Sequence, residues 1–293
     1  MAAIDTLVDI DAALLRAWPL PQPDGSADKE ERGSTLVLAG SAEMPGAAML
    51  AATSALRAGA GKIAVAAPAS VAAGIALRLA EARVLALPET DGGGMAADGM
   101  TKIEALLGKV DAVLVGPGLL DGAATRAFTR RLLKRTRAAI LLDALAMDVV
   151  LDVRRFDRAP LLTPHAGEMA HLTGLTRDEV NADPERHARE RALRWNAVVV
   201  LKGATTYIAT PDGECWRHTA SHVGLGTSGS GDALAGIIAG LAARGAPLAQ
   251  AAAWGVALHA RAGRALTDRL GPIGYLAGEI PGEVPALLHK LAQ

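Results

Sequence analysis

From residue 34 onward, short apolar runs alternate with longer segments in which apolar residues recur with helical periodicity. Apolar runs without polar interruption are typical of strands that are buried on both faces of a sheet. The expected strands are Thr35–Ala39, Ile63–Ala67, Ala112–Val115, Ala139–Leu142, Leu161–Leu162 and Val198–Leu201.

Helical patterns separate these strands. They cover Ala47–Ala58, Ser70–Leu79, Gly99–Leu107, Ala123–Arg135, Glu168–Thr173 and Pro184–Trp195. Regular strand–helix alternation predicts an α/β fold, in which a mostly parallel central sheet carries helices on both faces.

The C-terminal part follows a different pattern. Two short strand-like runs, Thr205–Ala209 and Glu214–Arg217, flank the turn Pro211–Gly213 and predict an antiparallel hairpin at one edge of the sheet. Helices then close the chain at Ala233–Ala243, Leu248–Thr267 and Val284–Leu291. We interpret residues 1–33 as an N-terminal extension and 34–293 as a single domain, because no linker or repeat divides them.

Composition excludes several functional classes. The 293 residues are 51% hydrophobic and carry a net charge of -1, which suits a globular domain and gives no electrostatic footprint for nucleic acid. Cys215 is the only cysteine, so an intramolecular disulfide is impossible. The acidic N-terminus argues against a secretory signal, and runs such as Ala233–Ala243 fall short of the ~20 residues that a membrane helix needs. We therefore expect a cytoplasmic protein without a membrane or nucleic-acid partner.

The most informative segment is the glycine-rich loop Gly224–Gly231, which runs straight into an apolar helix with Asp232 at the junction. The first N–H groups of a helix lack partners inside the helix, and glycines let a ligand approach them closely. The N–H groups of Gly229, Ser230 and Gly231 could therefore surround a phosphate. Asp232 is then either the N-cap of the helix or a base held beside a phosphoryl group.

Further polar segments follow the expected strands directly. In a parallel sheet the carboxyl ends of the strands share one rim, where ligands bind. The segments are Gly40–Ala47, Gly116–Leu119, Asp143-Ala144, Thr163–Glu168 and Lys202–Thr206. Each alone fits a turn or a cap, but together they predict a site at this rim.

Two side chains at the rim can each be interpreted in two ways. His165 is either a neutral hydrogen-bond donor to a ligand or a loop residue. Lys202 either offsets phosphate charge or extends from a strand end to solvent. Gly59–Lys62 is not a P-loop, because a strand rather than a helix follows it, and Gly116–Gly118 lacks the third glycine of a dinucleotide-binding fingerprint.

The complete ordered set resembles the ADP/ATP-dependent NAD(P)H-hydrate dehydratases of the ribokinase-like superfamily. The set is Gly46-Ala47, Gly116–Gly118, Asp143-Ala144, Thr163–Glu168, Lys202–Thr206 and Gly229–Asp232, and the resemblance covers residues 34–291. The last of these elements is shared with sugar, hydroxymethylpyrimidine and hydroxyethylthiazole kinases. Pro164–Glu168 and Lys202–Thr206 point more narrowly to the dehydratases. The resemblance implies a ribokinase-like three-layer sandwich.

The resemblance also implies a repair reaction. Reduced nicotinamide that has gained water at C6 (NADHX or NADPHX) is phosphorylated there by ADP or ATP with Mg²⁺, and loss of phosphate restores NAD(P)H. ADP is the expected donor, because bacterial relatives generally use it. Relatives form homo-oligomers, so we expect one here too, with a tetramer as one form.

Roles carry over to matching positions in the same way. Asp232 is implied as the base for the C6 hydroxyl, and Gly229, Ser230 and Gly231 as donors that stabilise the transferring phosphate. The implied nucleotide site consists of Lys202, Gly203, Ala204, Thr205, Thr206 and Gly231. The implied contacts to the hydrated dinucleotide are Ala47, Gly118, His165 and Asp232. No metal ligand is assigned.

The chain departs from the family pattern at several positions of the site. Met44 replaces an aromatic residue, Leu145 an acid, Asp148 and His222 an asparagine each, and Ser228 a glycine. These departures leave two alternatives open. One is a small-molecule kinase of the same superfamily that retains its phosphorylated product. The other is a catalytically silent nucleotide-binding relative.

Overall fold

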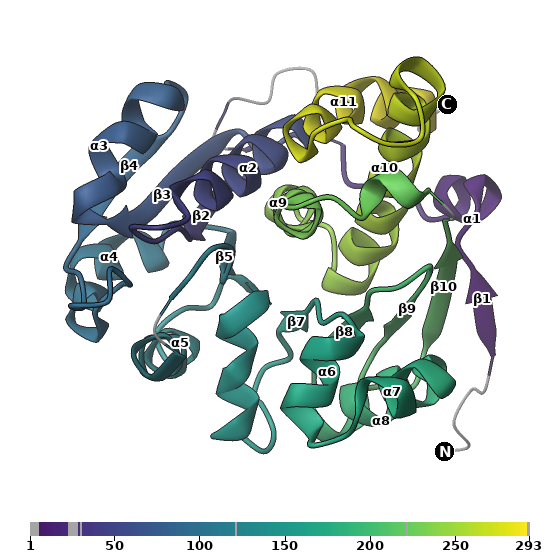
Figure 1. The fold of residues 1–293 in the computed structure, drawn as a ribbon, viewed down its shortest axis with the longest axis horizontal. Coiled ribbons are helices and arrows are strands. Elements are labelled where there is room, and N and C mark those ends of the chain that lie inside the picture. The colour runs from purple at the N-terminus through teal and green to yellow at the C-terminus, as the bar shows by residue number, and fades with distance from the viewer. Residues whose placement is uncertain (1–5, 23–28, 30, 121, 221, 292–293) are drawn as a thin grey trace.

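The computed structural model describes residues 6–22, 29, 31–120, 122–220 and 222–291. Within these residues a single sheet forms the middle layer and helices cover both of its faces (Figure 1). The expected α/β architecture is confirmed. No helix of the described part has the length and apolar character needed to cross a membrane.

The strands of the described chain form one sheet in the order β1-β10-β9-β8-β7-β6-β5-β2-β3-β4. All neighbours pair in parallel except β9, which runs antiparallel to both β8 and β10. The bounds are β1 Leu7–Asp9, β2 Ser34–Leu38, β3 Lys62–Pro68, β4 Arg83–Leu87, β5 Ala112–Val115, β6 Ala139–Leu142, β7 Leu161–Leu162, β8 Val198–Leu201, β9 Thr205–Ala209 and β10 Cys215–Thr219.

Two strands were not expected from the sequence. β4 adds one edge of the sheet beside β3, and β1 adds the other edge beside β10, where Leu7 pairs with Cys215. The predicted hairpin exists as β9 and β10, but its edge position was wrong, because β1 continues the sheet beyond it.

The α-helices divide between the two faces of the sheet. One apolar core lies under α2, α3, α9, α10 and α11, and the other lies under α4, α5, α6, α7 and α8. The bounds are α1 Ala12–Ala17, α2 Pro45–Arg57, α3 Ala69–Arg78, α4 Met100–Leu107, α5 Gly122–Leu133, α6 Ala166–Thr173, α7 Arg177–Ala182, α8 Pro184–Trp195, α9 Ser230–Ala243, α10 Leu248–Leu270 and α11 Ile280–Leu291. A 3-10 helix, Ala144–Leu151, follows β6.

Helix α9 packs against α2 so closely that only glycine fits at two positions. A Cβ on Gly236 would lie 2.2 Å from the Ala51 carbonyl oxygen, and one on Gly240 would lie 2.3 Å from that of Ala55. Apolar residues surround α9 on all sides, since nearly its whole length is buried. The rigid setting of α9 fixes the position of its N-terminus, which carries Asp232.

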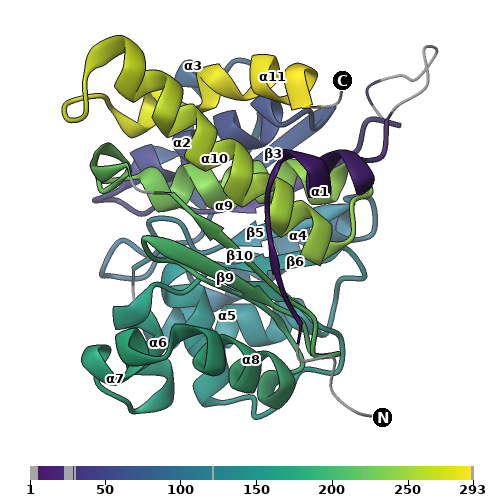
Figure 2. The ribbon, with the colours of Figure 1, turned by 90° about the vertical axis from the view of Figure 1, so that its right-hand side faces the viewer.

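The described residues 6–22 share the core of the domain. Figure 2 shows β1 and α1 beside β10 and α10. Leu15 on α1 is fully buried, and the carbonyl oxygen of Trp18 accepts hydrogen bonds from Trp254 Nε1 at 2.8 Å and Gln250 Nε2 at 3.1 Å. Trp18 also stacks on Trp216 of β10, with ring centroids 5.3 Å apart. This segment therefore braces β10 and α10. Residues 1–5, 23–28 and 30 of the predicted extension lie outside the described chain.

Candidate active site

The N-terminus of α9 opens directly from the glycine-rich loop. Gly229 is its N-cap residue and has a φ of 86°, a left-handed conformation that favours glycine. A side chain there would also collide with Leu50 of α2, since a Cβ would lie 2.6 Å from Leu50 Cδ1. Asp232 lies in the first turn of α9 and is not the N-cap. Of the two interpretations of Asp232, the N-cap was wrong, and its role as a base stays a prediction.

The surroundings of Asp232 suit a proton acceptor. Burial, and to a smaller extent the negative charge of the neighbouring Asp143, raise the pKa of Asp232 to about 7 against the opposing charge of Lys202. A general base works best when its pKa lies near the working pH. A pKa near 7 is consistent with the predicted role of Asp232 as a base.

Lys202 lies immediately after β8 and holds two carboxylates. Its Nζ is 3.4 Å from Asp143 Oδ1 and 3.8 Å from Glu168 Oε2. Burial lowers the pKa of Lys202, but Asp143, Glu168 and Asp232 outweigh that effect and the net direction is upward. Lys202 therefore stays charged. A Cβ on Gly231 would lie 3.5 Å from Lys202 Nζ, so the ammonium adjoins the start of α9.

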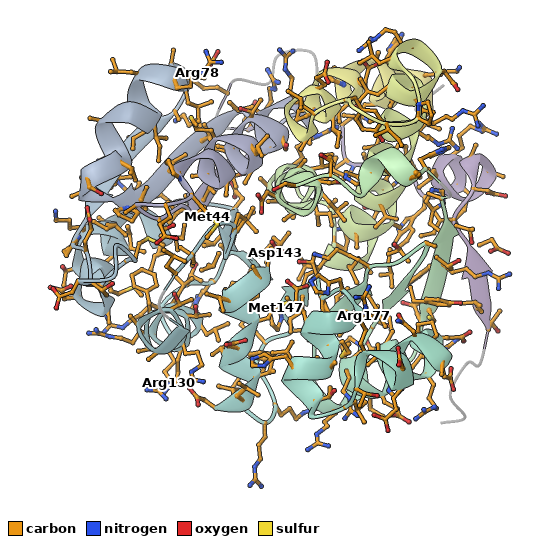
Figure 3. The ribbon with its side chains drawn as sticks, viewed as in Figure 1. Met44, Arg78, Arg130, Asp143, Met147 and Arg177 are labelled. Atoms are coloured by element: carbon orange, nitrogen blue, oxygen red, sulfur yellow. The ribbon has the colours of Figure 1, made fainter. Side chains whose placement is uncertain are left out.

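Asp143 follows β6 and lies in the central part of the molecule (Figure 3). Its carboxylate is buried and accepts a hydrogen bond from the Thr163 hydroxyl, which follows β7. Gly116, after β5, approaches so closely that a Cβ would fall 1.8 Å from the Asp143 carbonyl oxygen. Ala144 adopts a φ of 47°, which is strained for alanine. The ends of β5 and β7 therefore both contact Asp143 at the end of β6, β5 through the Asp143 backbone and β7 through its carboxylate.

His165 and Glu168 form a reciprocal cap at the start of α6. His165 Nδ1 accepts the N–H groups of Gly167 at 3.0 Å and Glu168 at 3.2 Å, and Glu168 Oε2 accepts the His165 N–H at 2.7 Å. Because Nδ1 accepts, the hydrogen of the neutral imidazole is assigned to Nε2. The side chain is 58% exposed, but its Nε2 also lies 3.6 Å from Glu168 Oε2, and the role of His165 as a donor to a ligand stays a prediction.

A cleft of about 760 Å³ opens between the end of β8 and the N-terminus of α9. That volume suits a nucleotide-sized ligand. Residues of the cleft that the sequence had singled out are His165, Lys202, Gly203, Ala204, Thr206, Ser230 and Gly231. Thr205 lines a smaller neighbouring pocket of about 260 Å³ instead. Asp232, Ala47 and Gly118 line neither of these two pockets.

Ala47 and Gly118 meet near the start of α2. Gly118 has a φ of 65°, and a Cβ there would lie 2.6 Å from Ala47 Cβ and 2.9 Å from the Met44 carbonyl oxygen. The two predicted dinucleotide contacts are thus neighbours. Leu50, further along the same helix, adjoins Gly229, so α2 connects this region to the start of α9.

The departures from the family pattern have defined positions. His222 lines the cleft, and Met44 is partly exposed beside Gly118. Asp148 lies in the 3-10 helix, and His171 Nε2 is 3.2 Å from its Oδ1. Nothing in the structure explains Leu145.

Three polar residues of the site were not among the predicted site residues: Asp143, Glu168 and His259. Asp143 and Glu168 lie in strand-end segments that the sequence analysis placed at the rim, but no role in the site was assigned to either side chain. His259 carries no such signal, because its contact to Ser230 joins residues 29 positions apart. Burial lowers the pKa of His259 to about 4, so its imidazole is neutral.

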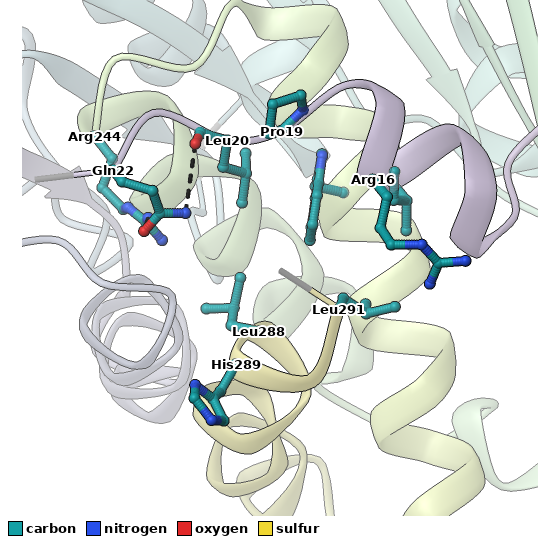
Figure 4. A pocket seen from close by; sticks show the side chains of 10 residues that line it. Arg16, Pro19, Leu20, Gln22, Arg244, Leu288, His289 and Leu291 are labelled. Atoms are coloured by element: carbon teal, nitrogen blue, oxygen red, sulfur yellow. Dashed lines mark hydrogen bonds between the residues drawn. The ribbon is translucent and has the colours of Figure 1, made fainter. Parts of the chain in front are cut away.

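A second cavity, of about 580 Å³, lies between residues 15–22 and the helices α10 and α11 (Figure 4). It shares no lining residue with the cleft. Arg244 at its edge donates to the carbonyl oxygens of Ala58 at 3.1 Å and Pro21 at 3.0 Å. The guanidinium therefore ties the backbone at Ala58 and at Pro21 to the end of α9, and so braces the N-terminal segment.

Comparison with known proteins identifies the family. The family model described as NAD(P)H-hydrate dehydratase matches residues 35–285. A Xanthomonas campestris protein named ADP-dependent (S)-NAD(P)H-hydrate dehydratase is 48% identical over 287 residues, which cover 96% of each chain.

Solved structures agree. The Bacillus subtilis ADP/ATP-dependent NAD(P)H-hydrate dehydratase, co-crystallised with ATP and Mg²⁺, superimposes with a TM-score of 0.86 at 30% identity, covering 98% of this chain and 99% of that one. A ribokinase-like superfamily protein of Enterococcus faecalis shares the fold at 24% identity, with a TM-score of 0.83 over 98% and 97% of the two chains. The chain described here belongs to the NAD(P)H-hydrate dehydratase family and has its ribokinase-like three-layer fold.

Proposed function

We propose that this enzyme restores NADH and NADPH from their C6 hydrates by phosphorylating the C6 hydroxyl and eliminating phosphate, with Asp232 as the base. The observation that carries the proposal is the Asp232 carboxylate, with a pKa near 7, in the first turn of α9 beside the Lys202 ammonium. A base and an anion-binding helix end at one place suit the transfer of a phosphoryl group to a hydroxyl.

The chemistry follows from these groups. Asp232 accepts the C6 hydroxyl proton as the oxygen attacks the terminal phosphorus of the nucleotide, and the remaining nucleotide leaves. The N–H groups of Gly229, Ser230 and Gly231 stabilise the charge that develops on the transferring group. The C6–O bond then breaks, and the C6 oxygen leaves as part of the phosphate. A proton leaves C5 and the ring double bond between C5 and C6 is restored. Phosphate is a far better leaving group than hydroxide.

The cleft between β8 and α9 would hold the nucleotide. Lys202 offsets phosphate charge, while Gly203, Ala204 and Thr206 supply the adjoining wall, with Thr205 behind them. The donor is proposed to be ADP, in agreement with the name of the Xanthomonas relative. The hydrated dinucleotide would lie against Ala47 and Gly118, with the His165 Nε2–H as a hydrogen-bond donor.

The residues present fit a nucleotide-bound Mg²⁺. Among the described residues there is no group of three or more His, Cys, Asp or Glu that could hold a metal ion alone. Mg²⁺ in phosphoryl-transfer sites is typically held by substrate phosphates, waters and one or two carboxylates. The carboxylates of Asp143 and Glu168, which lie on either side of the Lys202 ammonium, would supply those oxygens. When bound, the ion neutralises phosphate charge.

We further infer that the enzyme acts in the cytoplasm as a homo-oligomer, with a tetramer as the form to test. The chemistry of the substrate supports the cytoplasm. Exposed apolar side chains support the homo-oligomer, namely Val223, Leu270, Ile273 and Leu276. Analytical ultracentrifugation tests the assembly. A monomer at micromolar concentration would contradict it.

The function is tested by incubating purified NADH hydrate with the protein, Mg²⁺ and either ADP or ATP. We expect reduced-nicotinamide absorbance to recover only when nucleotide is present, and Asp232→Asn to abolish recovery while nucleotide still binds. No recovery with folded, nucleotide-binding protein would contradict the proposal and favour a kinase for another hydroxylated metabolite. Normal turnover by Asp232→Asn would remove Asp232 as the base.

A further inference from the structure

His259 on α10 reaches across the cleft wall to the first residue of α9. Its Nε2 lies 3.0 Å from the Ser230 hydroxyl oxygen and 3.1 Å from the Ser230 carbonyl oxygen. Both residues line the cleft, and Ser230 is almost completely buried. One ring nitrogen therefore contacts both oxygens of the residue that begins the anion-binding helix.

The two contacts together determine the direction of the hydrogen bonds. A carbonyl oxygen can only accept, so His259 Nε2 must carry the hydrogen. That hydrogen is shared between the carbonyl and the hydroxyl oxygen, in the three-centre arrangement common at helix ends. Because the Ser230 hydroxyl oxygen accepts this hydrogen bond, the hydroxyl does not donate its own hydrogen to His259. The O–H is free to point into the cleft.

The neighbouring loop residues make this hydroxyl distinctive. Gly229 and Gly231 have no side chains, so Ser230 alone among the three can add an O–H donor to their backbone N–H groups. The imidazole is uncharged, because burial keeps the pKa of His259 at about 4. The contribution of His259 is therefore a directed hydrogen bond rather than a charge.

We propose that His259 is a positioning residue that holds Ser230 so that the Ser230 hydroxyl donates to the phosphoryl group being transferred. This inference rests on the proposed function, which places that phosphoryl group at the N-terminus of α9. An additional donor that is already oriented stabilises the developing charge without reorganising during the reaction.

A set of variants separates positioning from packing. Ser230→Ala and His259→Met each remove the donor chain and should lower kcat roughly tenfold or more, with a smaller change in the nucleotide KM. His259→Gln keeps an N–H near the place of Nε2 and should recover most of the loss. The double variant Ser230→Ala/His259→Met should be no worse than the worse single variant, because the two residues act as one unit.

The matched control is His187→Met, which removes a buried histidine of α8 outside the cleft and should leave kcat unchanged. Losses that multiply in the double variant would overturn the inference, as would a His259→Gln variant as impaired as His259→Met. Either result would mean that His259 does not act by orienting the Ser230 hydroxyl.

An independent readout does not need activity. Imidazole ¹⁵N spectra of the wild-type protein, with the His259 signal identified from the His259→Gln variant, report which nitrogen carries the hydrogen. We expect a neutral ring protonated at Nε2 from pH 6 to 8. A ring protonated at Nδ1, or charged at pH 6, overturns the inference even if the enzyme is active. An inactive wild-type protein would contradict the proposed function, and the spectra would still decide the hydrogen bond.

Discussion

The Lys202 ammonium lies 3.4 Å from the Asp143 carboxylate, and these opposite charges act in opposite directions on Asp232. Asp143 raises the pKa of Asp232 and Lys202 lowers it. The pair also joins the end of β8 to the end of β6 across β7. The same ion pair therefore joins two strand ends and adjusts the pKa of Asp232, which burial raises most.

Replacing Lys202 should affect both nucleotide binding and the base. Lys202→Met removes the charge proposed to offset the phosphates, so the KM for nucleotide should rise more than the KM for the hydrated dinucleotide. The pKa of Asp232 in the free enzyme should also rise, which would move the pH dependence of kcat/KM to higher pH. Steady-state kinetics at several pH values measure both effects. Lys102→Met, an exposed lysine on α4, is the control. Unchanged nucleotide KM would remove Lys202 from the nucleotide site.

The pH dependence of turnover should report Asp232. A base must be deprotonated to work, so kcat/KM for the hydrated dinucleotide, which reports the free enzyme, should increase with pH through a midpoint of about 7. Asp143→Asn removes a negative neighbour and should shift this midpoint to lower pH, because the Asp143 charge raises the pKa of Asp232. A profile that is flat from pH 5 to 9 would contradict the assignment, as would a midpoint that Asp143→Asn moves upward.

Gly118→Ala should weaken binding of the hydrated dinucleotide without weakening binding of the nucleotide. The new Cβ would lie 2.6 Å from Ala47 Cβ, at a φ of 65° that disfavours alanine. The start of α2 must shift, so the KM for the hydrated dinucleotide should rise severalfold while nucleotide binding changes little. Gly213→Ala is the matched control, because it also has positive φ but nothing within 4 Å of its added Cβ. Equal effects of the two variants would mean that backbone strain alone is responsible.

Leu15→Ala should reveal how much the N-terminal segment stabilises the domain. The side chain is fully buried against the helical face of the core, so its truncation should cost about 2–5 kcal/mol in the free energy of unfolding. Urea titration followed by circular dichroism measures this loss. Leu77→Ala, at a side chain that is 89% exposed, should change the stability by less than about 0.5 kcal/mol. Similar stability of both variants would mean that residues 6–22 do not fold with the domain.

Much of the fold follows from the sequence because its parallel strands are short, apolar and buried on both faces. β5, β6, β7 and β8 were predicted with the bounds that the structure has. β4 was missed although Val84–Leu87 is a continuous apolar run, and it differs from the predicted strands in that most of its residues are only partly buried or exposed, as at a sheet edge. The short polar helix α7 was missed too, although Thr176 and Glu179 form a capping box that the sequence displays.

The remaining features depend on tertiary contacts. β1 is three residues long and becomes a strand only because β10 is beside it. The rim residues could be predicted together, since they follow neighbouring parallel strands. The contact between His259 and Ser230 could not, because helix packing alone brings α10 to the start of α9.

The central claim is that the C6 hydroxyl itself is phosphorylated, and its oxygen can be followed. NADH hydrate prepared with ¹⁸O in the C6 hydroxyl would be incubated with the enzyme, Mg²⁺ and unlabelled ADP, and the released phosphate analysed by mass spectrometry. Phosphorylation followed by elimination predicts that the ¹⁸O appears in inorganic phosphate as NADH is restored. Recovery of NADH with unlabelled phosphate and the ¹⁸O in water would contradict the account, because the hydroxyl would then have left without being phosphorylated.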